Sequence, residues 1–171
     1  MFIIFLLDVY AMLGKRNFGK FDCLVQTVPQ LFNSLRNSLN SSSLLMKAAH
    51  DEKPNIFDKL LKFSQDLSIV DSRGCNVFHY VAGDLNDEWW LDGLKKHVND
   101  NKKLKELLHQ KTKNAGDTPL HYAVSGNKPN SIKWLLSNGS DIDATNKNGY
   151  RVDDLFSDAE TKNLIRKYRD K

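Results

Sequence analysis

Apolar residues between positions 119 and 137 fall at helical spacing on two short segments. Leu120 and Ala123 lie one turn apart on the first segment, with alanine small enough to let a second helix approach closely. Ile132, Leu135 and Leu136 form an apolar stripe on the second. Because both segments are short and amphipathic, the pattern predicts two antiparallel helices packed against each other.

Polar and special residues mark the ends of these helices. Thr118 is a good N-cap, and Pro119 suits the first helical position, where its missing N–H is harmless. Gly139 is suited to end the second helix in a left-handed conformation. We therefore expect an extended finger over residues 140–148, followed by a turn at Gly149.

The same pattern recurs along the chain. Gly149 follows Gly116 by 33 residues. The stretch 74–80 (GCNVFHY) resembles the stretch 116–122 (GDTPLHY) and begins 42 residues before it. A further copy is revealed by an offset of 75 residues, which relates Lys-Pro-Asn at 53–55 to Lys-Pro-Asn at 128–130. That offset also pairs Ala48 with Ala123, Leu60 with Leu135, Leu61 with Leu136 and Leu67 with Ile142.

A 33-residue period with T-P-L-H-x-A is the signature of ankyrin repeats, and the sequence resembles that family over residues 41–170. The resemblance implies an all-α repeat solenoid of about three repeats plus a C-terminal cap, each repeat a helix-turn-helix with an extended β-hairpin finger. It also implies that the repeat histidines hydrogen-bond neighbouring repeats. The expected structural positions are Gly116, Thr118, Pro119, Leu120, His121, His79 and Gly149.

The repeats divide the chain into two parts. We expect an N-terminal extension over 1–40 and an ankyrin-repeat domain over 41–171, with repeats near 41–73, 74–115 and 116–148 and a cap over 149–171. Within the extension, residues 2–13 are apolar except for Asp8, yet too short to span a membrane. They are interpreted first as an element packed on the domain, with a start-site extension or an export signal as alternatives.

The second copy is nine residues longer than the 33-residue period, and the surplus falls between Trp89 and Leu108. We expect a split or elongated outer helix there. Residues 95–113 hold seven lysines and two acidic residues, so this segment accounts for the whole formal net charge of +4. Because the rest of the chain is nearly neutral, a chain-wide nucleic-acid surface is disfavoured. The segment is interpreted as a solvated helix face or as a contact for an acidic partner or phosphate backbone.

The chemistry of the sequence argues against an enzyme. The chain has no phosphate-binding glycine loop and no nucleophile elbow. Cys23 and Cys75 lie far apart without metal-ligand spacing, which is typical of reduced thiols in an intracellular compartment. We expect no catalytic residues, no metal and no cofactor.

The ankyrin resemblance implies a protein-binding surface built from finger tips and inner helices. Trp89 is added because Trp89 and Trp90 cannot easily be buried on one helical face; one ring either covers the lengthened loop or anchors an interface. The predicted partner-binding residues are Ser72, Arg73, Cys75, Thr112, Asn114, Asp117, Ser125, Thr145, Lys147, Asn148, Tyr150 and Trp89.

A narrower resemblance concerns the IκB-like ankyrin proteins, inhibitors that mask Rel/NF-κB transcription factors. It rests on the proline-containing turn at 53–55, the Asp-x-x-Gly at 71–74 before the overlong repeat, the opening of the next repeat over 107–121, and the late Gly149-Tyr150. The sequence departs from inducible members in having no D-S-G-x-x-S element and no acidic C terminus, and in its basic segment. In this it is similar to the IκB-like vankyrins of insect viruses, which implies constitutive inhibition.

The function predicted from sequence is therefore a non-enzymatic protein-binding scaffold, with Rel/NF-κB factors as the first candidate partner. An adaptor or secreted microbial effector that binds a different host protein is the alternative. We expect a monomer that acts in the cytoplasm, or in the host cytoplasm or nucleus for a viral protein or effector, with neither nucleic acid nor membrane as partner.

Overall fold

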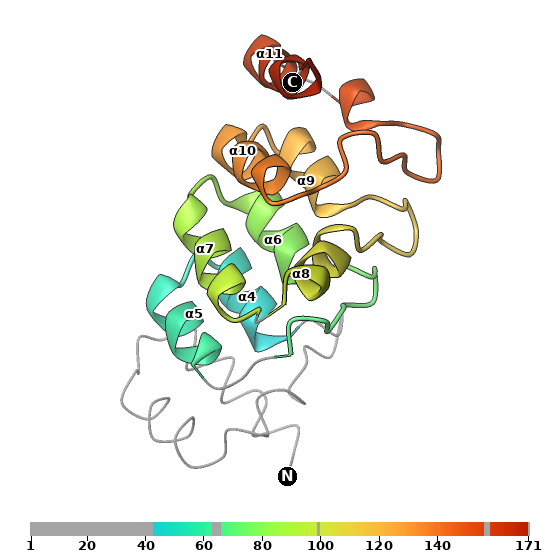
Figure 1. Ribbon diagram of the computed structural model, residues 1–171. Helices are drawn as coiled ribbons and strands as arrows, with labels where there is room; N and C mark the ends of the chain where they lie inside the picture. Colours follow the sequence, from blue (N-terminus) through green and yellow to red (C-terminus); the bar gives the residue numbers. More distant parts are fainter. Residues whose placement is uncertain (1–42, 63–65, 99, 156–157, 171) are drawn as a thin grey trace.

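The computed structural model describes residues 43–62, 66–98, 100–155 and 158–170, and its helices stack in pairs along one axis (Figure 1). Inner helices α4 (Leu44–His50), α6 (Val77–Asp84) and α9 (Pro119–Ser125) form one row. Outer helices α5 (Pro54–Leu61), α7 (Glu88–Lys96) and α10 (Pro129–Ser137) form the other. The 3-10 helix η1 (Val152–Asp154) and α11 (Ala159–Arg169) end the stack. The predicted all-α repeat solenoid is confirmed.

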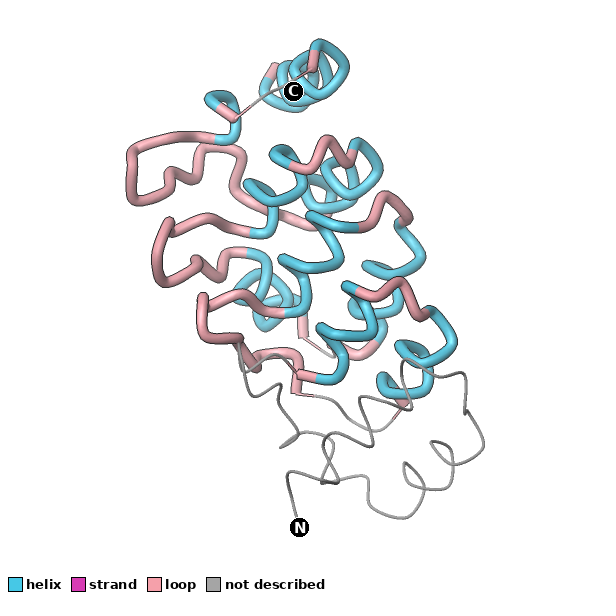
Figure 2. The backbone as a smooth tube through the Cα atoms, turned by 180° about the vertical axis from the view of Figure 1, so that it is seen from behind, coloured by secondary structure: helices cyan, strands magenta, loops and turns pink. Residues whose placement is uncertain are grey.

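Loops between successive repeats project as fingers along one edge of the stack, as Figure 2 shows from behind. The described finger segments are 66–76, 109–118 and 138–151. Each closes in a hairpin turn; in the first, the Asp71 amide donates to the Cys75 carbonyl at 2.9 Å. Within the described finger segments, β geometry is confined to an isolated bridge between Thr145 and Arg151, so the fingers are hairpin turns rather than pairs of regular strands.

Short polar side chains and prolines start the helices. The Ser43 hydroxyl accepts the Met46 amide at 3.2 Å at the start of α4, and the Asn76 side chain accepts the His79 amide at 3.3 Å at the start of α6. Proline occupies the first position of α5, α9 and α10. The helices therefore begin where the local sequence satisfies or removes the free amides of the first turn.

The core runs continuously through the stack because each repeat buries its apolar face against the next. Ala82 and Ala123 are fully buried where α6 packs on α9. In the outer row, the Phe57 and Trp90 rings lie 4.7 Å apart between centroids, in an edge-to-face arrangement. The Trp134 indole donates to Asp92 at 2.7 Å and joins α10 to α7.

The sequence predicts a split or an elongated outer helix in the overlong second repeat, and the structure has the split helix. Helix α7 ends at Lys96, and a separate helix α8 (Asn101–Leu108) follows before the second finger. Leu104, Leu107 and Leu108 of α8 are buried, while its remaining residues face solvent. The nine surplus residues thus build an additional amphipathic helix on the side of the stack.

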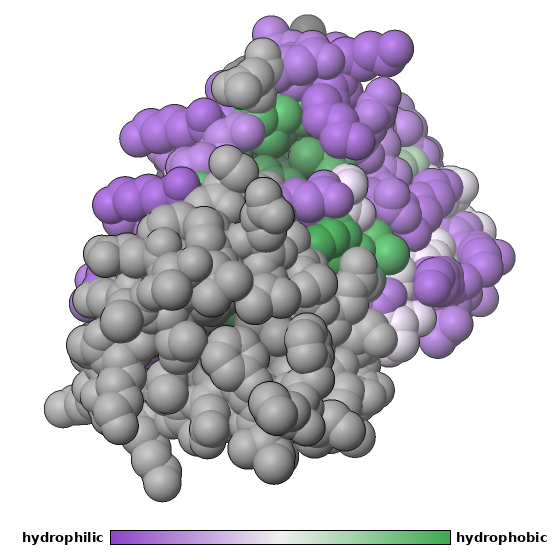
Figure 3. All heavy atoms as spheres, turned by 90° about the horizontal axis from the view of Figure 1, so that it is seen from below, coloured by the Kyte–Doolittle hydropathy of each residue, from purple (hydrophilic) through white to green (hydrophobic). Residues whose placement is uncertain are grey.

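The expected N-terminal extension over 1–40, including the apolar residues 2–13 and Cys23, lies outside the described residues. Within the described part of the chain, no helix is long and apolar enough to cross a membrane. On the face seen in Figure 3, hydrophilic side chains dominate the described surface, with hydrophobic residues visible in small patches between them.

Candidate functional site

Two buried histidines join each inner helix to the finger that follows it. The His79 Nε2–H group donates to the Asp117 carbonyl at 3.2 Å, and the His121 Nε2–H group donates to the Tyr150 carbonyl at 3.3 Å. The other ring nitrogen accepts a backbone amide at the helix start, from Asn76 at 3.1 Å for His79 and from Thr118 at 3.3 Å for His121. Both rings therefore act as spacers that fix the position of the next finger.

The fingers also bond directly to one another. The Lys113 amide donates to the Arg73 carbonyl, and the Lys147 amide donates to the Ala115 carbonyl, each at 2.7 Å. Gly116 has a φ of +75°, and a Cβ there would lie 2.8 Å from the side chain of Lys147. Gly149, with a φ of +80°, has open space at the same position of the last finger. The finger row is therefore held as one surface by its backbone.

A buried carboxylate organises the first finger. Asp71 is 1% exposed and accepts the amides of Arg73 at 2.9 Å and Cys75 at 2.8 Å, as well as the Tyr80 hydroxyl at 2.9 Å. Burial works to lower the pKa of Arg73, but its hydrogen bonds to Asp71 and Tyr80 outweigh that effect and raise it. The Arg73 guanidinium is thus held at one edge against the finger and remains half exposed.

Two of the predicted contact residues point into the protein, and for these the prediction is wrong. Cys75 is fully buried, with its Sγ 3.2 Å from the Tyr122 hydroxyl, and burial raises the pKa of its thiol. Thr112 is 5% exposed, and its hydroxyl accepts the Asp117 amide at 3.0 Å. Both side chains lie on the side of the hairpin turn that faces the helices. The position of a residue in the repeat, counted along the sequence, does not tell this buried side from the exposed side.

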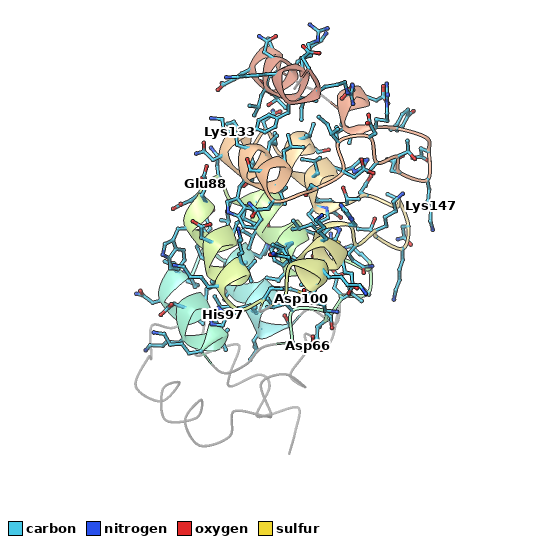
Figure 4. All side chains as sticks on the ribbon, in the orientation of Figure 1. Asp66, Glu88, His97, Asp100, Lys133 and Lys147 are labelled. Carbon is cyan, nitrogen blue, oxygen red and sulfur yellow. The ribbon has the colours of Figure 1, made fainter. Side chains whose placement is uncertain are left out.

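The remaining predicted finger residues lie at the surface. Figure 4 places Lys147 at the outer edge of the fingers, on the side of the molecule away from Glu88 and Lys133. Tyr150 exposes 51% of its surface, the largest exposure of an aromatic residue in the described chain. The exposed predicted residues of the fingers are Ser72, Arg73, Asn114, Thr145, Lys147, Asn148 and Tyr150.

A shallow hollow of about 330 Å³ lies between the fingers and the inner helices. The predicted residues Asp117 and Ser125 line it, together with Gly83, Asp84, His121, Tyr122 and Gly126. A Cβ at Gly126 would lie 2.4 Å from the Gly83 carbonyl oxygen, so the floor of the hollow exists because α6 and α9 approach without side chains there. Sequence reasoning did not assign Tyr122, although its position directly after the repeat histidine marks it.

Trp89 lies on the outer row rather than on this surface. Its ring packs edge-to-face on Trp90 at 5.2 Å between centroids and tilts against Phe57 at 6.4 Å. It exposes 46% of its surface, whereas Trp90 is buried at 6%. Trp89 therefore covers the contact between α5 and α7 and not the inserted segment, and the structure does not bring it together with the finger residues.

The described residues hold no group of three or more side chains able to ligate a metal ion. Both ring nitrogens of each buried histidine are bonded to backbone groups, and burial lowers the pKa of His79 to about 4 and also lowers that of His121. Burial, with the bond to Cys75, raises the pKa of Tyr122, so neither member of that pair is an activated nucleophile. What the arrangement does offer is a rigid, polar surface shaped by three fingers and a hollow.

The fold and this surface define a helical repeat protein with a row of fingers along one exposed edge. A model of ankyrin repeats in three copies matches residues 45–146, which is more than half of the chain, and the protein belongs to the ankyrin-repeat family. Members of this family generally serve as non-enzymatic interaction modules.

The chain is also 40% identical over 62 residues to the human "Protein phosphatase 1 regulatory subunit 27". That match covers 36% of this chain and 39% of the length of the relative. The similarity therefore extends over only part of each protein.

Proposed function

We propose that this protein is a scaffold that binds a protein partner across its finger tips and the adjoining hollow, and that it regulates the partner by covering part of its surface. The observation that carries the proposal is the pre-formed finger row. Its backbones are bonded finger to finger, while Asn114, Asn148 and Tyr150 project side chains without a described hydrogen bond. A surface already rigid before binding loses little conformational entropy when a partner docks.

For the partner, we propose a Rel/NF-κB transcription factor, which the protein masks as IκB-like ankyrin proteins do. The support is the order of features in the sequence, from the proline turn at 53–55, which starts α5, to Gly149-Tyr150 at the third finger. Because the sequence lacks a D-S-G-x-x-S element, inhibition would be constitutive. On this proposal the protein acts in the cytoplasm or nucleus of the cell that contains the Rel factor.

Purified protein should retain Rel-homology dimers in a pull-down at micromolar concentration. Asn114→Ala with Tyr150→Ala should weaken retention at least about tenfold, since exposed tyrosines often carry much of an interface's binding energy. Lys133→Ala with Asn163→Ala, exposed residues of α10 and α11, is the matched control and should bind like wild type. No retention of Rel dimers by the wild-type protein would reject the Rel proposal.

A second candidate partner follows from the similarity to a phosphatase regulatory subunit. The purified catalytic subunit of protein phosphatase 1 should therefore be assayed in parallel with the same variants. Retention of that subunit, sensitive to the finger substitutions and without retention of Rel dimers, would assign the surface to a phosphatase. Equal retention by the finger variant and the control variant would place the contact elsewhere on the protein.

A further inference from the structure

Helix α8 is the feature that the regular repeat does not require, and its exposed side is basic. Lys102, Lys103 and Lys105 face solvent on it, against a single acidic residue, Glu106. The helix is anchored from below by its three buried leucines. The insertion thus presents a lysine-rich face on a fixed support.

Part of the basic segment has a structural task. The Lys95 ammonium donates to the Asn138 side chain at 2.7 Å, the His109 ring donates to the Gly139 carbonyl at 3.0 Å, and the Lys111 ammonium donates to the Thr145 carbonyl at 2.6 Å. The Lys105 stem lies against Gly139. Lys95, Lys105 and His109 attach the basic segment to the end of α10, where carbonyl groups and the helix dipole favour positive charge, and Lys111 attaches it to the third finger.

Lys102 and Lys103 have no comparable task. Among the described residues, the Lys102 ammonium has no hydrogen-bond or ion-pair partner, and Lys103 has only a 3.5 Å contact to the exposed Glu106. Both lie in the first turn of α8, at the positive end of the helix dipole, where lysine is unfavourable. The Lys102 amide is not open to a ligand, since the Asp100 side chain accepts it at 2.9 Å. The charges of Lys102 and Lys103 therefore lower the stability of α8 and serve no contact in the described fold.

We propose that the exposed lysines of α8 bind an acidic segment of a protein partner, as a second contact beside the fingers. This inference rests on the proposed scaffold function, and it assigns the basic segment to recognition. A protein segment fits better than nucleic acid because carboxylates border the lysines. Asp66 and Asp100 line the same hollow as Lys103. Figure 4 labels both aspartates on the lower part of the stack. A continuous phosphate backbone would meet these carboxylates, whereas a short acidic peptide needs only the face of α8.

The test uses the full chain and a fluorescein-labelled poly-glutamate peptide, followed by fluorescence anisotropy at low salt. The wild-type protein should bind it saturably, and binding should weaken as salt rises. Lys102→Gln with Lys103→Gln should weaken binding about threefold, and Lys102→Glu with Lys103→Glu at least about tenfold. Since both pairs of changes relieve the unfavourable charges of the first turn, the thermal midpoint should not fall below that of wild type. Loss of binding then cannot come from unfolding.

Lys162→Glu with Lys167→Glu on α11 is the control, because it makes the same change in net charge at exposed positions. It should keep wild-type affinity; an equal loss would show a mere net-charge effect and overturn the proposal. Failure of the wild-type protein to bind poly-glutamate would also overturn the proposal, as would binding of mixed-sequence DNA more tightly than poly-glutamate. The finger variant Asn114→Ala with Tyr150→Ala should bind poly-glutamate normally, which separates failure of this inference from failure of the finger proposal.

Discussion

At the scale of single residues, buried polar groups decide how one repeat sits on the next. His79 and Asp71 are almost fully buried, yet both have hydrogen-bond partners: His79 bonds to backbone groups, and Asp71 accepts two backbone amides and the Tyr80 hydroxyl. For His79 this works only in the neutral form, because one ring nitrogen must accept the Asn76 amide while the other donates to the Asp117 carbonyl. Stacking is therefore tied to the protonation state of a single ring.

This tie predicts a pH dependence of stability. Burial lowers the pKa of His79 to about 4 in the folded protein, below the value of about 6.5 in an unfolded chain. Between these values the unfolded chain binds a proton that the folded ring does not. The contribution of neutral His79 to the free energy of unfolding is therefore complete above a pH of about 6.5. It is lost as the pH falls through about 4, and the loss is at most roughly 3 kcal/mol. Urea unfolding followed by circular dichroism across this range should show the decrease. The decrease should be shallower in His79→Gln, and an equally steep one would contradict the assignment.

At the scale of elements, α6 and the inserted α8 are joined by one side chain. Asn76 caps α6 through its side-chain oxygen, which accepts the His79 amide. Its side-chain NH2 donates to the Leu107 carbonyl in the last turn of α8 at 2.8 Å. A single buried amide thus serves as a helix cap and as the clamp that holds the insertion to the inner row.

Two substitutions separate these roles. Asn76→Ser keeps a capping oxygen but loses the bond to Leu107, and should lower the free energy of unfolding by about 1 kcal/mol. Asn76→Ala loses both and should cost about 2–3 kcal/mol. Hydrogen exchange of the α8 amides should rise in both variants relative to α10. Equal costs for the two substitutions would show that the cap contributes nothing, and an Asn76→Ser variant as stable as wild type would show that the clamp contributes nothing.

Elements whose signals are local could be predicted from the sequence. The start of α9 at Thr118 and Pro119 and the turn at Gly149 follow from capping and backbone preferences. The insertion was expected from its length, but the contacts of Lys95 with Asn138 and of Lys111 with Thr145 were not, because they depend on how the next repeat lies beside the basic segment. The position of a residue in the repeat also does not show which side of a hairpin turn packs against the helices. This is why Cys75 and Thr112, which the sequence placed on the contact surface, are buried, whereas their neighbour Asn114 is exposed.

At the scale of the whole molecule, the stack is a one-dimensional array in which each repeat contacts its neighbours. Helix α6 packs on α4 and α9, whereas α11 packs on α10 at the end of the described chain. Its buried residues are Thr161 and Ile165, and its other side carries exposed charges. In such arrays, stability is the sum of repeat and interface contributions. The effect of a core substitution should therefore depend on its place in the stack.

A matched pair of cavity-forming substitutions tests this expectation. Ile165→Ala in α11 and Leu120→Ala in α9 remove similar fully buried side chains and should each cost about 2–5 kcal/mol locally. In hydrogen-exchange mass spectrometry, Ile165→Ala should raise exchange in α11 and η1 while α4 to α7 keep wild-type protection. Leu120→Ala lies between two neighbours and should raise exchange in α6 and α10 alike. If Ile165→Ala instead raised exchange uniformly over all described helices, the protein would unfold as one cooperative unit, and α11 would be an integral part of the fold rather than an end cap.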